Sequence, residues 1–397
     1  MASSEVMDVQ VAEAVAVLPP RPDAIMTLLT TDDFFLGVQT LQYSVKKHLP
    51  ANLSYPPELV VLVTPNISES TRNALHPAFC TRILQVDPID FPESSNELVA
   101  SHIDCWQVQG GLTKLHIFRL ENYDTILYLD ADCLVVKDVS HLLDLGKVYT
   151  ESEALIAASP DVFPPDKFNG GVLVVRPSRP VFDNMMAQSS LLATYDGGDT
   201  GFLNAYYSNW YTEMPPTARL SFGYNAQRFM YHCTYEKQPN YWDMAVAPDL
   251  HVIHYSSSPK PWETMGKPKQ EVQEHLGESE ARKLRASKSA KTTELEALWR
   301  KTYQRSKTFA EKYRKAQEER RATASAPKTT ATASKPASNG ANTKNHVHKL
   351  IMKRYKELRS KGMSTSEAMG VARSQYGLDQ TDNIPAASQV ASLFGMM

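Results

Sequence analysis

The sequence is poor in features that mark several classes of protein. Its four cysteines (Cys80, Cys105, Cys133 and Cys233) are widely spaced and form no CxxC pair, which indicates neither a zinc site nor a disulfide framework. No apolar run reaches the roughly 18 residues of a membrane span. The N-terminal segment carries acidic but no basic residues before its apolar stretch, unlike a secretory signal. We therefore expect a cytoplasmic protein without a transmembrane segment.

The sequence also has no large excess of positive or negative charge. The 42 Lys and Arg residues nearly balance 44 Asp and Glu, for a net charge of -2 at pH 7. Nucleic-acid-binding proteins usually carry a basic excess, so we expect no nucleic-acid partner. The composition, 42% hydrophobic and 22% charged, is ordinary for a globular protein.

Apolar strand-like segments alternate with helix-like segments through the first two thirds of the chain. The alternation predicts an α/β fold with a mostly parallel central sheet covered on both faces. Strands are expected at 24–30, 59–64, 83–87, 125–130, 155–161, 170–177 and 249–255. Helices are expected at 34–47, 66–75 (with Asn66 as its cap), 113–119, 178–190 and 198–207.

Changes in composition predict five segments. They are a disordered segment 1–22, a main domain 23–265, a charged helical extension 266–321, an Ala/Ser/Thr/Lys-rich linker 322–345 and a small helical module 346–397. The last module has a basic helix face, which is usually solvated, opposite an apolar stripe that requires burial. We expect it to dock on a protein partner.

The segment LYLDADCLVV (127–136) contains the strongest chemical signal. Asp130 and Asp132 follow a strongly apolar run, and alternation along a strand would make both carboxylates project together. Two such charges repel each other unless a divalent cation such as Mg²⁺ or Mn²⁺ lies beside them. The pair predicts a metal site at the end of a central strand, where α/β sheets bind ligands.

Three further segments hold candidate residues. DGGDTGFLN contains Asp196 and Asp199, which would approach a sugar or metal, although Asp199 also suits a helix N-cap over 200–207. HVIHYSSSPKPW contains His254, a candidate metal ligand, and Lys260, a candidate diphosphate contact. Asn169, in FNGGVLVVRPS, precedes a buried strand. Taken singly, His254 and Asn169 have ordinary structural explanations.

These segments, together with TLLTTDDF (27–34) and TKLHIF (113–118), resemble in sequence and order the family 8 glycosyltransferases, and most closely the glycogenin-like enzymes. The resemblance covers roughly residues 24–263. It implies a Rossmann-like GT-A fold for a nucleotide-diphospho-sugar transferase, with Mn²⁺ (or Mg²⁺) as cofactor and UDP-glucose as the usual donor. It also implies transfer of a hexose with retention of the anomeric configuration.

The resemblance further implies roles for individual residues. Those near the uridine and the rest of the donor are Leu28, Thr30, Phe34, Lys114, Asp130, Ala131 and Asn169. Metal ligands are Asp130, Asp132 and His254. Asp196 and Asp199 contact the donor sugar and, with Lys260 on the diphosphate, form the catalytic set.

Departures from the family pattern concern the sugar and the acceptor. The family's DGGDQG has Thr200 in place of the glutamine here, and its FNSG has Gly170 in place of the serine. The acceptor is expected to be a protein tyrosine or a glycan. Among Tyr224, Tyr231, Tyr235 and Tyr241 the sequence nominates none, and a homodimer is left open.

Two other functions compete with this one. Haloacid-dehalogenase-like phosphatases also use a strand followed by DxD, but they place Thr or Val two residues after the second Asp, where this chain has Leu134. Alternatively, the domain is a non-catalytic scaffold whose helical tail binds a partner. The intact set of Asp130, Asp132, His254 and Lys260 favours an enzyme.

Overall fold

The computed structural model describes residues 21–91, 110–149, 155–162, 166–192, 194–230, 242–265 and 290–325. The chain divides into two compact units, Met1–Ala324 and Ser325–Met397. The described residues belong almost entirely to the first. The expected module 346–397 and nearly all of segments 1–22 and 322–345 lie outside them, so the predicted domain boundaries remain predictions.

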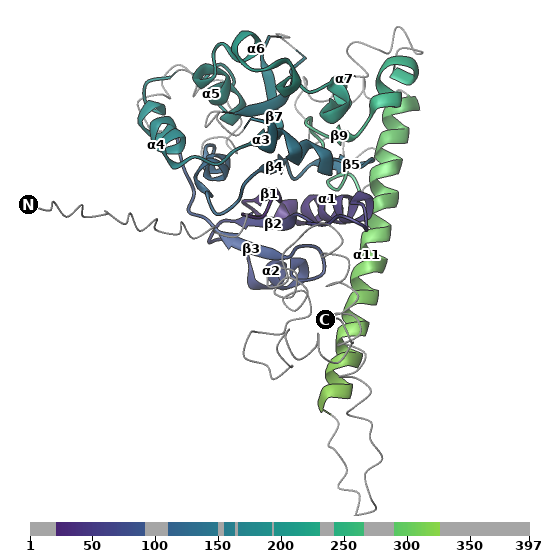
Figure 1. Ribbon diagram of the computed structural model, residues 1–397. Helices are drawn as coiled ribbons and strands as arrows, with labels where there is room; N and C mark the ends of the chain where they lie inside the picture. The colour runs from purple at the N-terminus through teal and green to yellow at the C-terminus, as the bar shows by residue number, and fades with distance from the viewer. Residues whose placement is uncertain are drawn as a thin grey trace, which may run out of the picture. The chain divides into compact units, whose positions relative to one another are not determined.

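A six-stranded mixed sheet forms the centre of the first unit, in the order β3-β2-β1-β4-β7-β6. Figure 1 labels β3, β2, β1, β4 and β7 of this sheet. The strands of the sheet are β1 (Ala24–Leu29), β2 (Glu58–Val63), β3 (Arg82–Gln85), β4 (Ile126–Leu129), β6 (Ile156–Pro160) and β7 (Phe168–Val175). The first four strands are parallel to one another, whereas β7 runs antiparallel to both β4 and β6. The connection between β6 and β7 is too short for the crossover that a parallel pair requires.

The helices follow the strands in the expected α/β order. In chain order they are η1 (Asp32–Phe34), α1 (Phe35–His48), α2 (Glu69–Leu75), η4 (Thr113–Arg119), η5 (Ser140–Leu143), α3 (Asp144–Val148), α4 (Arg179–Gln188), α5 (Asp199–Tyr206), α6 (Trp210–Glu213), η6 (Pro216–Ala218), η7 (Phe222–Tyr224), α7 (Arg228–Met230), η9 (Trp242–Val246), η10 (Ala247–Asp249) and α11 (Ala290–Ser325).

Two predicted helix caps are wrong. The cap of α2 is Ser68, whose hydroxyl accepts the Thr71 N–H at 3.3 Å. Asn66 instead donates its side-chain amide to the Thr30 carbonyl, 2.7 Å away. The cap of α5 is Gly198, and Asp199 is the first residue inside the helix. Each predicted cap lies one or two residues before or after the observed one, because several capping residue types are clustered there.

Side chains of β4 alternate between two apolar layers, as in any sheet covered on both faces. Tyr128 packs with η4 and α4 residues in one cluster, and Leu127 and Leu129 pack with α1 in the other. The alternation places the centre of the sheet between two cores. The end of β4 is therefore held rigidly on both sides.

A second, three-stranded sheet has the order β5-β9-β8. It consists of β5 (Cys133–Val135), β9 (Val252–His254) and β8 (Ala226–Gln227), with β5 antiparallel and β8 parallel to β9. The chain leaves β4 at Leu129 and enters β5 at Cys133. Residues 130–132 therefore join the two sheets.

The long helix α11 packs against this domain through its first half. Trp299 is fully buried there, and Gln39 of α1 donates a hydrogen bond to Ser306 at 2.8 Å. Tyr43 of α1 contacts Phe309 with a ring separation of 5.7 Å. Within the described ranges, no helix combines the length and the apolar character that crossing a membrane requires.

Candidate metal and nucleotide-sugar site

Asp130 and Asp132 lie on the turn between the two sheets. Both carboxylates face His254, as expected, but strand alternation is not the reason, because β4 ends at Leu129 and β5 begins at Cys133. The turn is fixed by a hydrogen bond from the Cys133 N–H to the Asp130 carbonyl at 2.9 Å. The Tyr255 N–H, which follows β9, also donates to the Asp132 carbonyl at 3.0 Å. This turn brings both carboxylates to His254.

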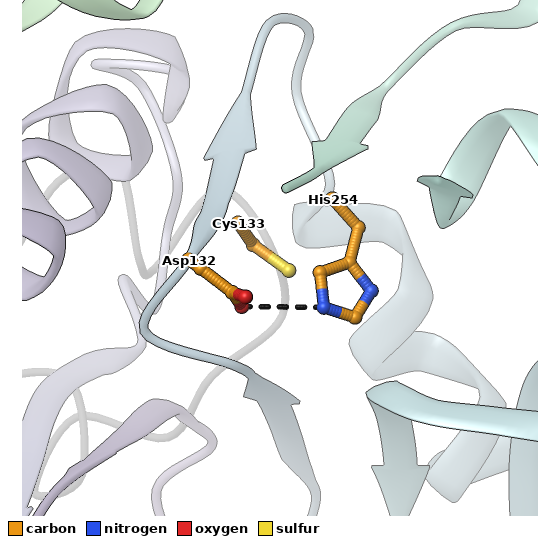
Figure 2. A group of neighbouring side chains, drawn as sticks. All are labelled: Asp132, Cys133 and His254. Atoms are coloured by element: carbon orange, nitrogen blue, oxygen red, sulfur yellow. Dashed lines mark ion pairs between the residues drawn. The ribbon is translucent and has the colours of Figure 1, made fainter. Parts of the chain in front are cut away.

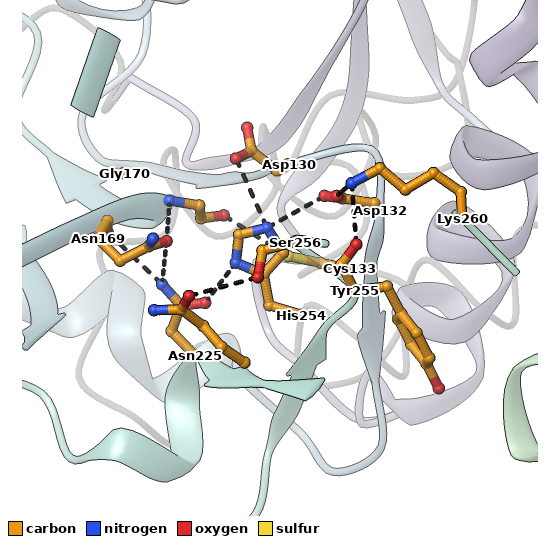
Figure 3. A network of polar contacts seen from close by, with 12 residues as sticks. Asp130, Asp132, Cys133, Asn169, Gly170, Asn225, His254, Tyr255, Ser256 and Lys260 are labelled. Atoms are coloured by element: carbon orange, nitrogen blue, oxygen red, sulfur yellow. Dashed lines mark hydrogen bonds and ion pairs between the residues drawn. The ribbon is translucent and has the colours of Figure 1, made fainter. Parts of the chain in front are cut away.

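Each aspartate presents one oxygen to His254 (Figure 3). Its other oxygen faces a lysine. Asp130 Oδ2 and Asp132 Oδ1 lie 3.9 and 3.2 Å from His254 Nε2. Asp130 Oδ1 lies 3.0 Å from Lys114 Nζ, and Asp132 Oδ2 lies 2.6 Å from Lys260 Nζ. The two lysines balance the two carboxylates, while one oxygen of each aspartate faces the same nitrogen of His254.

This spacing fits a divalent cation. Ligand atoms roughly 2.1 Å from an octahedral ion lie about 3 Å apart when adjacent and about 4.2 Å apart when opposite. The separations of 3.2 and 3.9 Å between His254 Nε2 and the carboxylate oxygens of Asp132 and Asp130 fall within that range. Two carboxylates and an imidazole suit Mn²⁺ better than a soft metal.

Cys133 is near these ligands but is a poor one. Its side chain lies beside Asp132 and His254 in a buried group (Figure 2). Burial, reinforced by the charges of Asp132 and Asp130, raises the pKa of the Cys133 thiol well above its usual range. Its sulfur lies 3.6 Å from the Gly171 carbonyl, to which a thiol donates. A protonated thiol is not a metal ligand, since thiolate is the binding form.

A chain of hydrogen bonds fixes the tautomer of His254 (Figure 3). The Gly171 N–H donates to Asn169 Oδ1 at 2.9 Å, which must therefore be the amide oxygen. Asn225 Nδ2 donates to the same oxygen at 2.9 Å, so Asn225 presents its own Oδ1 to His254 Nδ1, 2.8 Å away. Because that oxygen only accepts, Nδ1 donates this hydrogen bond, and Nε2 is the nitrogen that would bind a metal.

The charges at this site are strongly coupled. Burial would raise the pKa of Asp132, but Lys260 and His254 outweigh it and hold that pKa well below its usual range. Burial likewise opposes the charge of Lys114, yet Asp130 and Asp199 raise its pKa above the usual range. Asp132 is therefore a carboxylate and Lys114 an ammonium at neutral pH.

Lys114 links the metal ligands to the start of α5. Its Nζ lies 2.5 Å from Asp199 Oδ2 and donates to the Gly170 carbonyl at 3.0 Å. Burial raises the pKa of Asp199, and Lys114 only partly offsets this because Asp130 repels the same carboxylate. Asp199, Lys114 and Asp130 thus form a continuous row of charged groups.

Asp196 occupies a different position from Asp199. Its Oδ1 accepts hydrogen bonds from the Thr194 hydroxyl at 2.9 Å and from the N–H groups of Gly198 and Gly201 at 2.8 and 2.9 Å. These bonds hold the loop that leads into α5. The observed contacts of Asp196 are thus structural, and a role in binding the donor sugar is a prediction.

The residues expected around the uridine lie at the same edge of the sheet. Leu28 is near the end of β1, and Thr30 follows that strand. Phe34 contacts Trp262, two residues after Lys260, with a ring separation of 5.3 Å. The Ala131 carbonyl closely faces Gly37, where a Cβ would lie only 2.6 Å from it. Neighbouring parallel strands end here together, which is why these residues are near the two aspartates.

Of the four candidate acceptor tyrosines, only Tyr224 lies within the described residues. Its hydroxyl is 2.8 Å from His141 Nε2, and its ring stacks on His251 at 4.4 Å. It is thus held by residues other than the metal ligands. Tyr231, Tyr235 and Tyr241 are outside the described residues.

Sequence reasoning missed Asn225 and Tyr128. Asn225 is fully buried and positions His254, and the Tyr128 hydroxyl donates to Asp130 Oδ1 at 3.0 Å. Tyr128 had one signal in the sequence: it is the polar-tipped residue of the apolar run before the aspartates, and a buried tyrosine hydroxyl usually has a hydrogen-bond partner. Asn225 had no local signal.

The fold and the site together define a class: an α/β protein in which two aspartates and a histidine form a candidate metal site beside the end of a central strand. The sequence profile described as "Glycosyl transferase family 8" matches residues 25–266. The chain belongs to that family. Family membership and the mixed, mostly parallel sheet confirm the expected GT-A type of fold.

Individual relatives agree with the family. Mouse glycogenin-1 is 32% identical over 239 residues, which is 60% of this chain and 65% of that protein. Inositol phosphorylceramide glucuronosyltransferase 1 of Arabidopsis thaliana is 31% identical over 257 residues, covering 60% of this chain and 42% of its own length. The match thus spans less than two thirds of either relative. A solved structure of the bifunctional glycosyltransferase WbbM is similar with a TM-score of 0.44 and 19% identity, covering 63% of this chain and 48% of that one.

Proposed function

We propose that this protein is a Mn²⁺-dependent, retaining hexosyltransferase that moves glucose from UDP-glucose to a protein tyrosine or a glycan, as the glycogenin-like resemblance implies. A cytoplasmic location is part of the same proposal. Family membership supports sugar transfer, whereas the metal, donor and acceptor are inferred from the site residues and from the relatives' names.

One observation carries the proposal: Asp130 and Asp132 each turn one oxygen towards His254 Nε2, while a lysine neutralises the other oxygen of each. Such a site favours a dication whose remaining positions are taken by diphosphate oxygens. A bound Mn²⁺ would supply Lewis-acid stabilisation of the departing diphosphate. Lys260, beside Asp132, is placed to neutralise the same charge.

The sugar half of the reaction depends on Asp199. When the anomeric C–O bond breaks, the sugar becomes oxocarbenium-like, and a nearby carboxylate stabilises that cation. Asp199 is anchored by Lys114, which also contacts Asp130 at the metal side. In this proposal, the row of charges would extend from the departing diphosphate to the sugar. Both a covalent and a front-face route are compatible with this position.

Family membership decides against the phosphatase alternative. If the domain were a non-catalytic scaffold, it would have the same fold but would release no UDP from a sugar donor. UDP release therefore separates it from the proposed enzyme.

The proposal is tested by incubating the full chain with Mn²⁺ and UDP-glucose while following UDP release and intact mass. We expect UDP release that requires the metal, and a mass ladder in hexose steps if the chain is its own acceptor. Asp132→Asn should reduce turnover about a thousandfold, since the metal supplies several kcal/mol. Asp183→Asn, on the exposed face of α4, is the matched control. Absence of UDP binding, or full turnover by Asp132→Asn, would refute the proposal.

A further inference from the structure

Arg228 is a buried arginine that organises the segment before Lys260. Its side chain is 4% exposed. One terminal nitrogen donates to the Ser257 carbonyl at 2.9 Å, to the Ser257 hydroxyl at 2.8 Å and to the Pro259 carbonyl at 3.1 Å. Because the guanidinium is a planar fork, its second terminal nitrogen remains available for a partner on the other side. Arg228 thus fixes segment 257–259 directly ahead of Lys260.

The other side of Arg228 faces α11. Its second terminal nitrogen lies 3.4 Å from Glu296 Oε1, and its guanidinium lies over the Tyr255 ring at 5.4 Å. The Tyr255 hydroxyl donates to the Leu295 carbonyl of α11 at 2.6 Å. Two adjacent residues of α11 therefore hold both the arginine and the ring beneath it. A buried arginine requires such a partner, because an unpaired buried charge is costly.

Lys260 is reached directly from this assembly. Its Nζ donates to the Tyr255 carbonyl at 2.9 Å and to Asp132 Oδ2 at 2.6 Å. The position of the ammonium therefore depends on Tyr255 and on segment 257–259, both of which Arg228 contacts. Helix α11 begins at Ala290, beyond the family match at 25–266.

We infer that Glu296 and Arg228 are positioning residues, through which α11 holds segment 257–259 so that Lys260 reaches the diphosphate of the donor. This inference rests on the proposed function, because it assigns Lys260 to that diphosphate. It makes a helix outside the family region part of the donor site. If α11 only stabilised the fold, a change in Glu296 would affect UDP binding equally with and without Lys260.

The test measures UDP binding by calorimetry in the presence of Mn²⁺, with the full chain. Glu296→Gln keeps the shape of the side chain and removes the charge that faces Arg228. We expect the dissociation constant for UDP to rise about five- to tenfold. Glu318→Gln is the matched control: it is the same substitution on the same helix, at a side chain that is 68% exposed. This control should bind UDP as the wild type does.

A second measurement distinguishes positioning from folding. The Glu296→Gln change is repeated in a Lys260→Met background, where the group to be positioned is gone. We expect no further loss of UDP affinity there, because residues that act through one group are not additive. Thermal unfolding monitored by circular dichroism shows whether each variant is folded, and Glu296→Asp replaces Glu296→Gln if the latter is not.

The outcomes are separable. Wild-type affinity in Glu296→Gln, or an equal loss with and without Lys260, would overturn the inference while leaving the proposed function intact. A wild-type protein that binds no UDP with Mn²⁺ would overturn both.

Discussion

Asn225 and His254 are in direct contact at the candidate metal site: Asn225 Oδ1 lies 2.8 Å from His254 Nδ1 and accepts a hydrogen bond from it. The Asn225 amide is oriented by its hydrogen bond to Asn169 Oδ1, which also accepts the Gly171 N–H. This contact turns the other ring nitrogen, Nε2, towards Asp130 and Asp132. Such hydrogen bonds to metal-binding histidines orient the ring and raise its basicity.

Removing this contact should weaken metal binding without altering any ligand. Asn225→Leu preserves volume but neither accepts from His254 nor donates to Asn169. We expect the affinity for Mn²⁺ to fall about 10- to 100-fold, the range typical of such partners. Titration followed by electron paramagnetic resonance of free Mn²⁺ measures it. Asn184→Leu, on the exposed face of α4, is the control, and equal affinity in both variants would contradict the prediction.

The two departures from the family pattern contact each other. The Gly170 N–H donates to the Thr200 hydroxyl at 3.1 Å, and a Cβ at position 170 would lie 2.7 Å from that oxygen. Gly170→Ser alone should therefore lower the free energy of unfolding by about 1–3 kcal/mol through overpacking. In a Thr200→Gln background, which lacks that hydroxyl, the loss should be smaller by about 1 kcal/mol. Urea unfolding of both single variants and the double variant measures this coupling, and strict additivity would show that the two positions are independent.

Packing of α11 against the domain depends on Trp299. Its side chain is fully buried, with ring separations of 5.5 Å from Trp262 and 5.6 Å from Tyr303. Trp299→Ala should lower the free energy of unfolding by about 3–5 kcal/mol because it leaves a large cavity. Leu298→Ala, at a neighbouring residue that is 37% exposed, should lower it by less than about 1 kcal/mol. Similar effects of the two changes in urea unfolding would show that this face of α11 is not buried.

The buried thiol of Cys80 should be unreactive in the folded protein. Burial raises its pKa to about 12, and the thiolate is the reactive form. Alkylation by iodoacetamide should be very slow at pH 8 and rise about tenfold per pH unit up to pH 10, as the thiolate fraction does. Peptide mass spectrometry locates the label, and protein in urea, where the pKa is ordinary, is the control. Rapid labelling of folded protein at pH 8 would contradict this burial.

The same shift has a consequence for stability. The folded-state pKa of Cys80 lies above the unfolded value, so its contribution to folding is complete below the unfolded pKa. It is lost as the pH rises from there towards about 12. Replacing Cys80 with alanine should therefore flatten the decline in stability above pH 9, measured by thermal unfolding.

Much of the fold was predictable because its signals are local. The apolar runs located β1, β2, β4 and β7, and the order of strands and helices indicated a mostly parallel sheet. The direction of β7 was not predictable, since an apolar run has the same composition whichever way it pairs. That β4 and β5 belong to different sheets was not predictable either, because apolar residues continue on both sides of the two aspartates.

The candidate site was predictable where a residue type carried its own chemistry. Asp130, Asp132, His254 and Lys260 are unusual next to buried strands, and the structure brings all four together. Asn225 and Arg228 were missed because a single amide or guanidinium in a polar segment has many ordinary explanations. Their roles arise only from contacts with distant segments.

The sequence by itself determined the succession of elements and the set of charged residues beside them, since periodicity and residue chemistry depend on near neighbours. The tertiary structure alone decided which oxygen of each aspartate faces a lysine and which faces His254. Lys260 and Asp132 are 128 positions apart and meet only because β5 pairs with β9 in one register. Contacts of that kind depend on how the sheets assemble, and no local pattern in the chain specifies them.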